Sequence, residues 1–284
     1  MTTDNDKSTI DFGRAFAFVA DDPRWLWKLL LIAVFSGVAF VLIIGPLTLF
    51  TLSIIPEQTF ADLAEIDPRL EDLRVELTPG QRYQLLLPVA SGLLLTALLL
   101  GYYIQLVANT RAGQMHPLPN WDAWTRKLVD GLTMQTAYAL YLLSAAVFYG
   151  VGIVLVRLIG GLNAELIQVV LGLCILFPLL LVYLLGVIFV TSINVLPYSQ
   201  SRRFTDFFQV GWAWRRLRQD TGLTFKWFLF GFTANFGFSV VQALPVVQIL
   251  GYLLSFFMTV PVQGHLLGQY GAALDERHGD ALAA

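Results

Sequence analysis

The sequence predicts an all-α integral membrane protein with six transmembrane helices arranged as three hairpins, each preceded by an interfacial amphipathic helix on the cytoplasmic side. Three observations lead to this fold class. The chain is 56% hydrophobic and only 13% charged, whereas soluble domains are about half apolar and about a quarter charged. It contains long stretches without charge, and a helix needs about 20 apolar residues to cross a bilayer. Its Lys and Arg residues gather in alternate loops.

The uncharged stretches place the spans at approximately 29–55, 85–108, 132–156, 166–196, 224–244 and 246–268. The last two come from one stretch, Trp227 to Leu274, in which His265 is the only basic or acidic side chain. This stretch is too long for one crossing, and Pro245 favours a tight hairpin in its middle. The first stretch is longer than the apolar region of a cleaved signal peptide, so we expect it to stay as an anchor. A transmembrane domain over 29–274 thus follows a cytoplasmic arm, 1–28, and precedes a cytoplasmic tail, 275–284.

The distribution of basic residues predicts the orientation. Fourteen of the 18 Lys and Arg residues fall in the arm, in the tail and in two loops, 109–131 and 197–223, or at their edges. Short cytoplasmic loops collect Lys and Arg. We therefore expect both termini on the cytoplasmic side of a bacterial-type inner membrane.

The segment 56–84, between the first two spans, is acidic. It has seven carboxylates against three arginines, which favours the extracytoplasmic side. Apolar residues recur in it at helical spacing, and Asp67 before Pro68 is typical of a helix start. Two readings stay open, a solvated loop resting on the membrane or capping the bundle, and an acidic vestibule that attracts cations.

Aromatic residues beside basic ones predict the interfacial helices. In the loop 109–131, Trp121 and Trp124 share a helical face with Leu128, and Asp122 and Asp130 point away from it. We interpret these two carboxylates as solvated. The arm and the loop 197–223 follow the same plan, with phenylalanines and Trp212. Such helices lie in the headgroup plane.

Five arginines of the loop 197–223 form its basic cluster. The positive-inside rule alone accounts for their charge, and contact with anionic lipid headgroups is the sharper hypothesis. For the same reason we expect no nucleic-acid partner. The five are Arg202, Arg203, Arg215, Arg216 and Arg218.

Catalytic motifs are absent from the sequence. It has no Gly-rich phosphate loop, H-E-x-x-H or G-x-S-x-G. The three histidines have no metal spacing, and His265 is read as a hydrogen-bonding residue rather than a haem ligand. The single cysteine, Cys174, is read as a small apolar filler in the fourth span. We expect no enzyme activity, no cofactor and no metal.

Ionisable groups are absent from the centres of the expected spans, which disfavours proton-coupled transport. Amides remain as interior polar groups. They cement helices through hydrogen bonds, or they line a pathway for a neutral solute. The candidates are Asn235, Gln242, Gln248 and Gln105.

Several motifs resemble one known family. They are Asp22-Pro23-Arg24-Trp25, the run Pro117 to Trp124 (PLPNWDAW), Val129-Asp130-Gly131 and the closing run Gly264 to Tyr270 (GHLLGQY). Together they resemble the bacterial and archaeal membrane proteins that bear domain-of-unknown-function number four thousand and thirteen. The chain departs from that family at Asn120 and Ala123, where acidic residues are usual, and in its long acidic segment. The resemblance implies a multi-spanning membrane protein and no particular activity.

Two functions remain as expectations. The first is a non-catalytic scaffold or accessory subunit that docks other membrane proteins through its interfacial helices and acidic segment. The second is a permease or lipid-handling protein for a neutral or amphipathic solute, with Asn235 and Gln242 in its pathway. The lipid bilayer, including anionic headgroups, is the partner that both share.

Overall fold

The computed structural model describes residues 9–54, 76–160, 170–245 and 247–278. Most of these residues are helical and none of them lies in a strand, which confirms the all-α class. Six helices are long: α2 (Trp25–Ile54), α5 (Leu86–Arg111), α6 (Trp124–Gly160), α8 (Phe177–Ser201), α10 (Thr221–Ala243) and α11 (Gln248–His278). The short elements are α1 (Arg14–Ala17), η1 (Phe18–Asp21), α4 (Pro79–Gln84), η3 (Gly172–Leu176), η4 (Phe204–Phe208) and α9 (Val210–Gln219).

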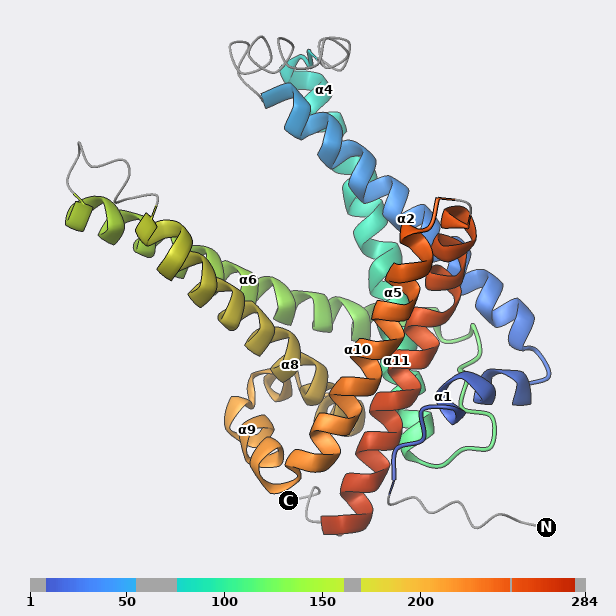
Figure 1. Cartoon of the computed structure of the whole chain (residues 1–284). Coiled ribbons are helices and arrows are strands. Elements are labelled where there is room, and N and C mark those ends of the chain that lie inside the picture. The colour runs from blue at the N-terminus through green and yellow to red at the C-terminus, as the bar shows by residue number, and fades with distance from the viewer. Residues whose placement is uncertain (1–8, 55–75, 161–169, 246, 279–284) are drawn as a thin grey trace.

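The long helices lie in pairs that diverge from a common base (Figure 1). Helices α2 and α5 form one arm, and α6 with α8 forms a second arm that points away from the first. Helices α10 and α11 pack against each other, and α11 also packs along α5. Leu244, Pro245 and Val247, which lie between these two helices, are in a bend or turn. All three pairs meet at the base of the molecule.

Four helical stretches are long and apolar enough to cross a membrane, Trp25–Ile54, Pro79–Arg111, Trp124–Leu158 and Gly172–Ser201. The other two expected spans correspond to α10 and α11, which are not among these four. Both carry more polar groups, such as Lys226 and Asn235 in α10 and Gln263 and His265 in α11. Both also pack against other helices of the protein, where Gln263 and His265 have hydrogen-bond partners.

A close crossing fixes α6 against α5. A Cβ atom added at Gly101 of α5 would lie 1.8 Å from the carbonyl oxygen of Lys127, and one added at Gly131 of α6 would lie 1.7 Å from that of Ala97. No side chain fits at such distances. Each helix therefore supplies a glycine where it meets the backbone of the other, the small-residue contact typical of membrane helices.

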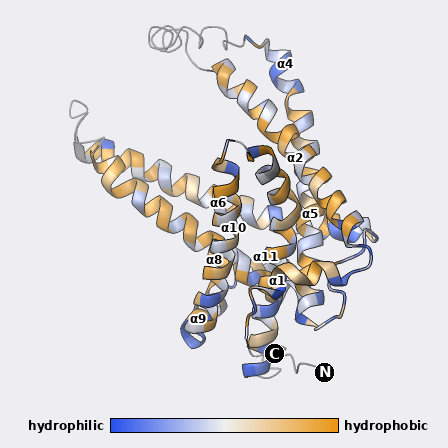
Figure 2. Cartoon of the chain, turned by 45° about the vertical axis from the view of Figure 1, so that its right-hand side comes forward, coloured by the Kyte–Doolittle hydropathy of each residue, from blue (hydrophilic) through white to orange (hydrophobic). Residues whose placement is uncertain are grey.

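One end of the molecule is polar, and we call it the polar end: η1, η4, α9 and the ends of α5, α8 and α11 near Arg111, Ser201 and His278. Figure 2 shows hydrophilic residues gathered around α9 and the end of α11, whereas the arms are mostly hydrophobic. The main core lies beside this end and includes Leu196, Tyr198, Phe207, Leu266 and Tyr270. The arms are covered far less by their own protein. In the most apolar part of Trp124–Leu158, only 6% of the residues are buried.

The loop 109–131 differs from its expected form. We expected a separate interfacial helix there, but α6 runs without a break from Trp124 to Gly160. No proline follows Trp124 within this helix, so nothing separates the amphipathic part from the apolar part. Trp121 lies before the helix. In the loop 197–223, η4 and α9 do form separate short elements.

Some expectations lie outside the described residues. These are the arm up to residue 8, the acidic segment from 56 to 75, the loop 161–169 with the expected start of the fourth span, and the tail from residue 279. The described part of the acidic segment begins at Glu76. It contains α4, which starts with a capping box in which Thr78 and Gln81 bond each other's backbone N–H.

Candidate functional site

A cavity of about 540 Å³ lies where α5, α6, α8, α10 and α11 meet. Its walls are mainly aliphatic and aromatic, and none of the residues that line it carries a charge. Its size is within the range of about 300–1,000 Å³ that holds small molecules in proteins. The polar groups of its walls are neutral: Thr96, Tyr103, Tyr138, Ser192, Trp227, Asn235, Thr259 and Gln263.

Helix α10 supplies one wall of the cavity. Trp227, Gly231 and Asn235 follow one another at intervals of four residues, so they share a face of this helix. Gln263 of α11 donates a hydrogen bond from Nε2 to the carbonyl oxygen of Gly231, at 2.9 Å. A Cβ atom at residue 231 would lie 2.9 Å from Gln263 Oε1. Glycine at this position thus lets the carboxamide of Gln263 join the two helices within the wall.

Asn235 has an unusual place in the cavity. It lines the wall and is also exposed on the outside of α10, as are its neighbours Phe228 and Phe232. Its side chain has no hydrogen bond to another described residue. The cavity therefore reaches the outer surface of the helices beside a free carboxamide.

The other interior candidates do not line the cavity. Gln242 and Gln248 flank the turn between α10 and α11, and Gln105 is half-buried on α5. Of the four amides selected from the sequence, Asn235 alone belongs to the cavity wall. Gln263 belongs to it as well and was not selected. Its position four residues after Thr259 was the available signal, since both share a face of α11.

The polar end is held by ion pairs between helices. Arg111, at the end of α5, binds Asp275 of α11 through two hydrogen bonds of 2.6 Å. Its Nη1 also donates to the carbonyl oxygen of Leu196 in α8, at 2.9 Å. The side chain of Arg111 is 5% exposed. One guanidinium thus joins three helices, and sequence reasoning assigned it only to orientation.

Asp130 is buried, so our expectation that it is solvated was wrong. The Tyr198 hydroxyl donates to Asp130 Oδ1 at 3.0 Å, and Arg202 forms an ion pair with Oδ2. These contacts join α6 to the end of α8. The aspartate needs them because a buried carboxylate without partners is costly. Asp122, by contrast, is exposed, and its backbone carbonyl accepts a hydrogen bond from Lys127.

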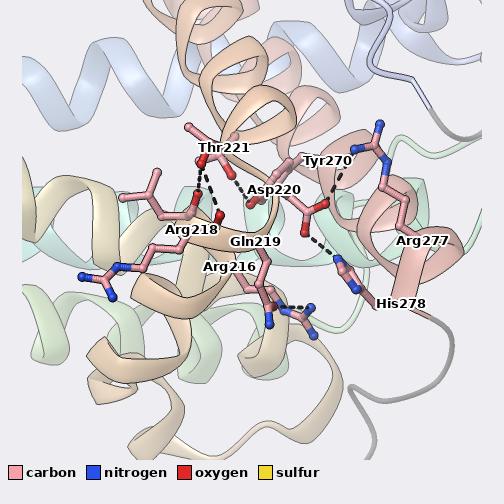
Figure 3. Close-up of polar contacts among 10 residues, drawn as sticks. Arg216, Arg218, Gln219, Asp220, Thr221, Tyr270, Arg277 and His278 are labelled. Atoms are coloured by element: carbon pink, nitrogen blue, oxygen red, sulfur yellow. Dashed lines mark hydrogen bonds and ion pairs between the residues drawn. The ribbon is translucent and has the colours of Figure 1, made fainter.

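A second charged cluster lies at the start of α10, beside the end of α11 (Figure 3). The carboxylate of Asp220 accepts a hydrogen bond from His278 Nε2 at 2.5 Å and lies 3.6 Å from Arg277 Nη1. The hydroxyls of Thr224 and Tyr270 form a hydrogen bond beside it. Asp220 thereby ties the start of α10 to the end of α11.

The run Pro117 to Trp124, which we call the tryptophan motif, contributes its two tryptophans to a small aromatic cluster. Trp121 stacks on Tyr102 with ring centroids 4.7 Å apart, and its indole N–H donates to the carbonyl oxygen of Lys28. Trp124 packs beside Trp121, with centroids 5.4 Å apart. Lys28 in turn binds Asp22 and the carbonyl oxygen of Leu118. The motif therefore ties the start of α2 to the segment before α6.

His265 is buried at 6% exposure and stacks on Phe18 with centroids 3.9 Å apart. Its Nδ1 lies 3.3 Å from the hydroxyl of Thr110. Among the described residues, no group of three or more His, Cys, Asp or Glu is placed to hold a metal ion. Cys174 is exposed, so it fills no gap in the core and our reading of it was wrong.

The five arginines of the basic cluster divide into two groups. Arg202 is held by Asp130, and Arg216 is buried over the ring of Trp212. The remaining three, Arg203, Arg215 and Arg218, are exposed.

Comparison with protein families gives one match. The model of a family described as protein of unknown function, DUF4013, matches residues 85–247, which include four of the six long helices and most of the cavity. No curated protein and no solved structure matches the chain. The matched region is more than half of the 284 residues. The chain therefore belongs to the DUF4013 family.

Proposed function

We propose that this protein is a six-span membrane protein that binds a neutral or amphipathic, lipid-like molecule in its central cavity and handles or transports it. The membrane helices are arranged as three hairpins, α2 with α5, α6 with α8 and α10 with α11. Both termini lie at the cytoplasmic side of the inner membrane. The basic residues of the polar end support this orientation, and the side-by-side packing of consecutive long helices in Figure 1 supports the hairpins.

The observation that carries the proposal is the chemistry of the cavity. An uncharged wall of aliphatic and aromatic groups favours an apolar ligand, and a few neutral polar groups orient its polar part. A carboxamide exposed to hydrocarbon without a partner is unfavourable. Asn235 would gain a partner if the polar part of the ligand lay beside it. Because Phe228, Phe232 and Asn235 are also exposed, such a molecule could enter from the bilayer.

Two amides on the same helix provide a matched test. The probe is radiolabelled monoolein, a neutral single-chain amphiphile, bound to the full chain in nanodiscs. Asn235→Leu removes a hydrogen-bonding group from the cavity wall, and we expect it to weaken binding about tenfold, the loss of one hydrogen bond to the ligand. Gln242→Leu makes a similar change outside the cavity, and we expect less than a twofold effect.

Liposomes then distinguish binding from transport. Wild-type protein that binds monoolein and also speeds its exchange between leaflets would support transport, and binding without exchange would support lipid handling. If wild-type protein shows no saturable binding, or if both variants bind equally well, the cavity is not the site of the function.

A scaffold role is the second candidate, and the poorly covered arms favour it. The α6–α8 arm leaves long apolar side chains exposed, including Leu143, Val151 and Leu155 of α6. Either lipid or another membrane protein covers this surface in the bilayer. Purification in mild detergent tests the role. A partner at fixed stoichiometry would support an accessory subunit, and a stable lone monomer would count against it.

A further inference from the structure

We infer that the exposed face of η4 and α9 binds the phosphate headgroups of anionic phospholipids. We call this face the arginine face; its basic residues are Arg203, Arg215 and Arg218, and its apolar residues are Phe204, Phe208, Val210 and Trp214. The inference rests on the proposal that α8 and α10 span the membrane. It is independent of the cavity and of its ligand.

The contacts of the arginines decide which of them can bind a ligand. Arg202 forms an ion pair with Asp130. Arg216 lies over the ring of Trp212 and donates a hydrogen bond to Gln219. Both arginines therefore already have partners within the protein. Arg203, Arg215 and Arg218 make no ion pair with any described residue. Figure 3 shows the side chain of Arg218 pointing away from Asp220, the nearest carboxylate along the chain. Three guanidinium groups thus remain for an external anion.

The apolar residues of the face identify the kind of anion. Trp214 is 52% exposed, and the guanidinium of Arg218 lies 5.0 Å from the centroid of its ring. Phe204, Phe208 and Val210 are also more than a third exposed. Tryptophan is enriched at headgroup depth, and exposed apolar groups beside arginines are typical of helices that lie in the interface. A soluble phosphate would use the arginines but would leave these apolar groups in water.

The connections of the face keep it at the membrane. Helix α8 ends at Ser201 and α10 begins at Thr221, so η4 and α9 lie between two proposed spans. Short connections join them to both spans. The face therefore cannot move far from the headgroups. Anionic lipids attract each nearby Lys or Arg, and Arg binds phosphate through two hydrogen bonds at once.

Native mass spectrometry of the full chain tests the inference. Phosphatidylglycerol and, separately, phosphatidylcholine are titrated into the protein in nonionic detergent. The test variant is Arg215→Gln with Arg218→Gln. The control variant is Arg24→Gln with Arg126→Gln, which removes two positive charges from other exposed side chains that are also expected on the cytoplasmic side. Thermal melting of each variant checks the fold.

We expect wild-type protein to bind phosphatidylglycerol more tightly than phosphatidylcholine. The test variant should lose about fivefold in affinity for phosphatidylglycerol per arginine, about 25-fold in all, with unchanged affinity for phosphatidylcholine. The control variant should lose less than twofold. Arg215→Lys with Arg218→Lys should fall between these values, because lysine keeps the charge but not the paired hydrogen bonds.

Three results would overturn the inference. An equal loss in the control variant would mean that net charge, and not this face, attracts the lipid. No preference of the wild type for phosphatidylglycerol would remove the site. Displacement of the lipid by millimolar inorganic phosphate would show that the arginines bind free phosphate. None of these results bears on monoolein binding in the cavity, which is measured separately.

Discussion

Arg111 and Asp275 form a two-bond ion pair, with both N–O distances at 2.6 Å, although 164 residues separate them in the chain. The pair joins the end of α5 to α11, and the bond from Arg111 to Leu196 adds α8. These are three of the five helices that enclose the cavity. This ion pair therefore helps to fix the positions of α5, α8 and α11 around the cavity.

Replacing Arg111 should destabilise the protein more than replacing an exposed arginine. Arg111→Gln leaves Asp275 without its partner and frees the carbonyl of Leu196. Breaking a buried pair costs about 3–5 kcal/mol, and we expect roughly 2 kcal/mol here because Asp275 is 34% exposed. Thermal melting in detergent measures the change. Arg126→Gln, an exposed control, should melt within a degree or two of wild type, and equal melting of both variants would refute a structural role for the pair.

The crossing of α5 and α6 should tolerate no side chain. Gly101→Ala places a methyl group against the backbone of Lys127, and we expect a loss of about 2 kcal/mol or more from the forced separation of the helices. Gly150→Ala on α6 is the matched control, since open space surrounds that position. Alanine favours a helix by up to about 1 kcal/mol over glycine, so the control should melt at or above the wild-type temperature. A neutral Gly101→Ala would mean that the two helices do not cross so closely.

The side of the membrane on which residue 244 lies distinguishes six spans from four. In a Cys174→Ser background, single cysteines replace Arg82, Arg215 and Leu244, and intact cells are treated with a membrane-impermeant maleimide. If α10 and α11 span the membrane, cysteines at 82 and 244 react and the one at 215 reacts only after the cells are opened. If they do not span, the cysteine at 244 behaves like the one at 215, and the bundle has four spans.

The helical class could be predicted from the sequence because it depends on local properties. A run of uncharged residues indicates a membrane helix over its own length, and Pro245 breaks the helix at its own position. Asp130 could not be interpreted in this way. Its partners, Tyr198 and Arg202, lie 68 and 72 residues away, and helical spacing alone placed it on a solvated face.

The cavity shows the same limit. Asn235 was selected because it is an amide in an apolar stretch, and this criterion selected Gln242 and Gln248 equally. Only the packing of five helices separates Asn235 and Gln263 from them. The uninterrupted α6 also shows that a change from amphipathic to apolar sequence does not by itself break a helix.

Photo-crosslinking tests the central claim, a lipid-like ligand in the cavity, most directly. A monoolein analogue with a diazirine in its acyl chain is irradiated with the full chain in nanodiscs, and the labelled peptides are mapped by mass spectrometry. We predict labels within Trp227–Asn235 of α10 and Thr259–Gln263 of α11, and their loss in the presence of excess monoolein. Labels confined to the outer surface of α6, around Leu143 and Val151, and unaffected by excess monoolein, would contradict the claim.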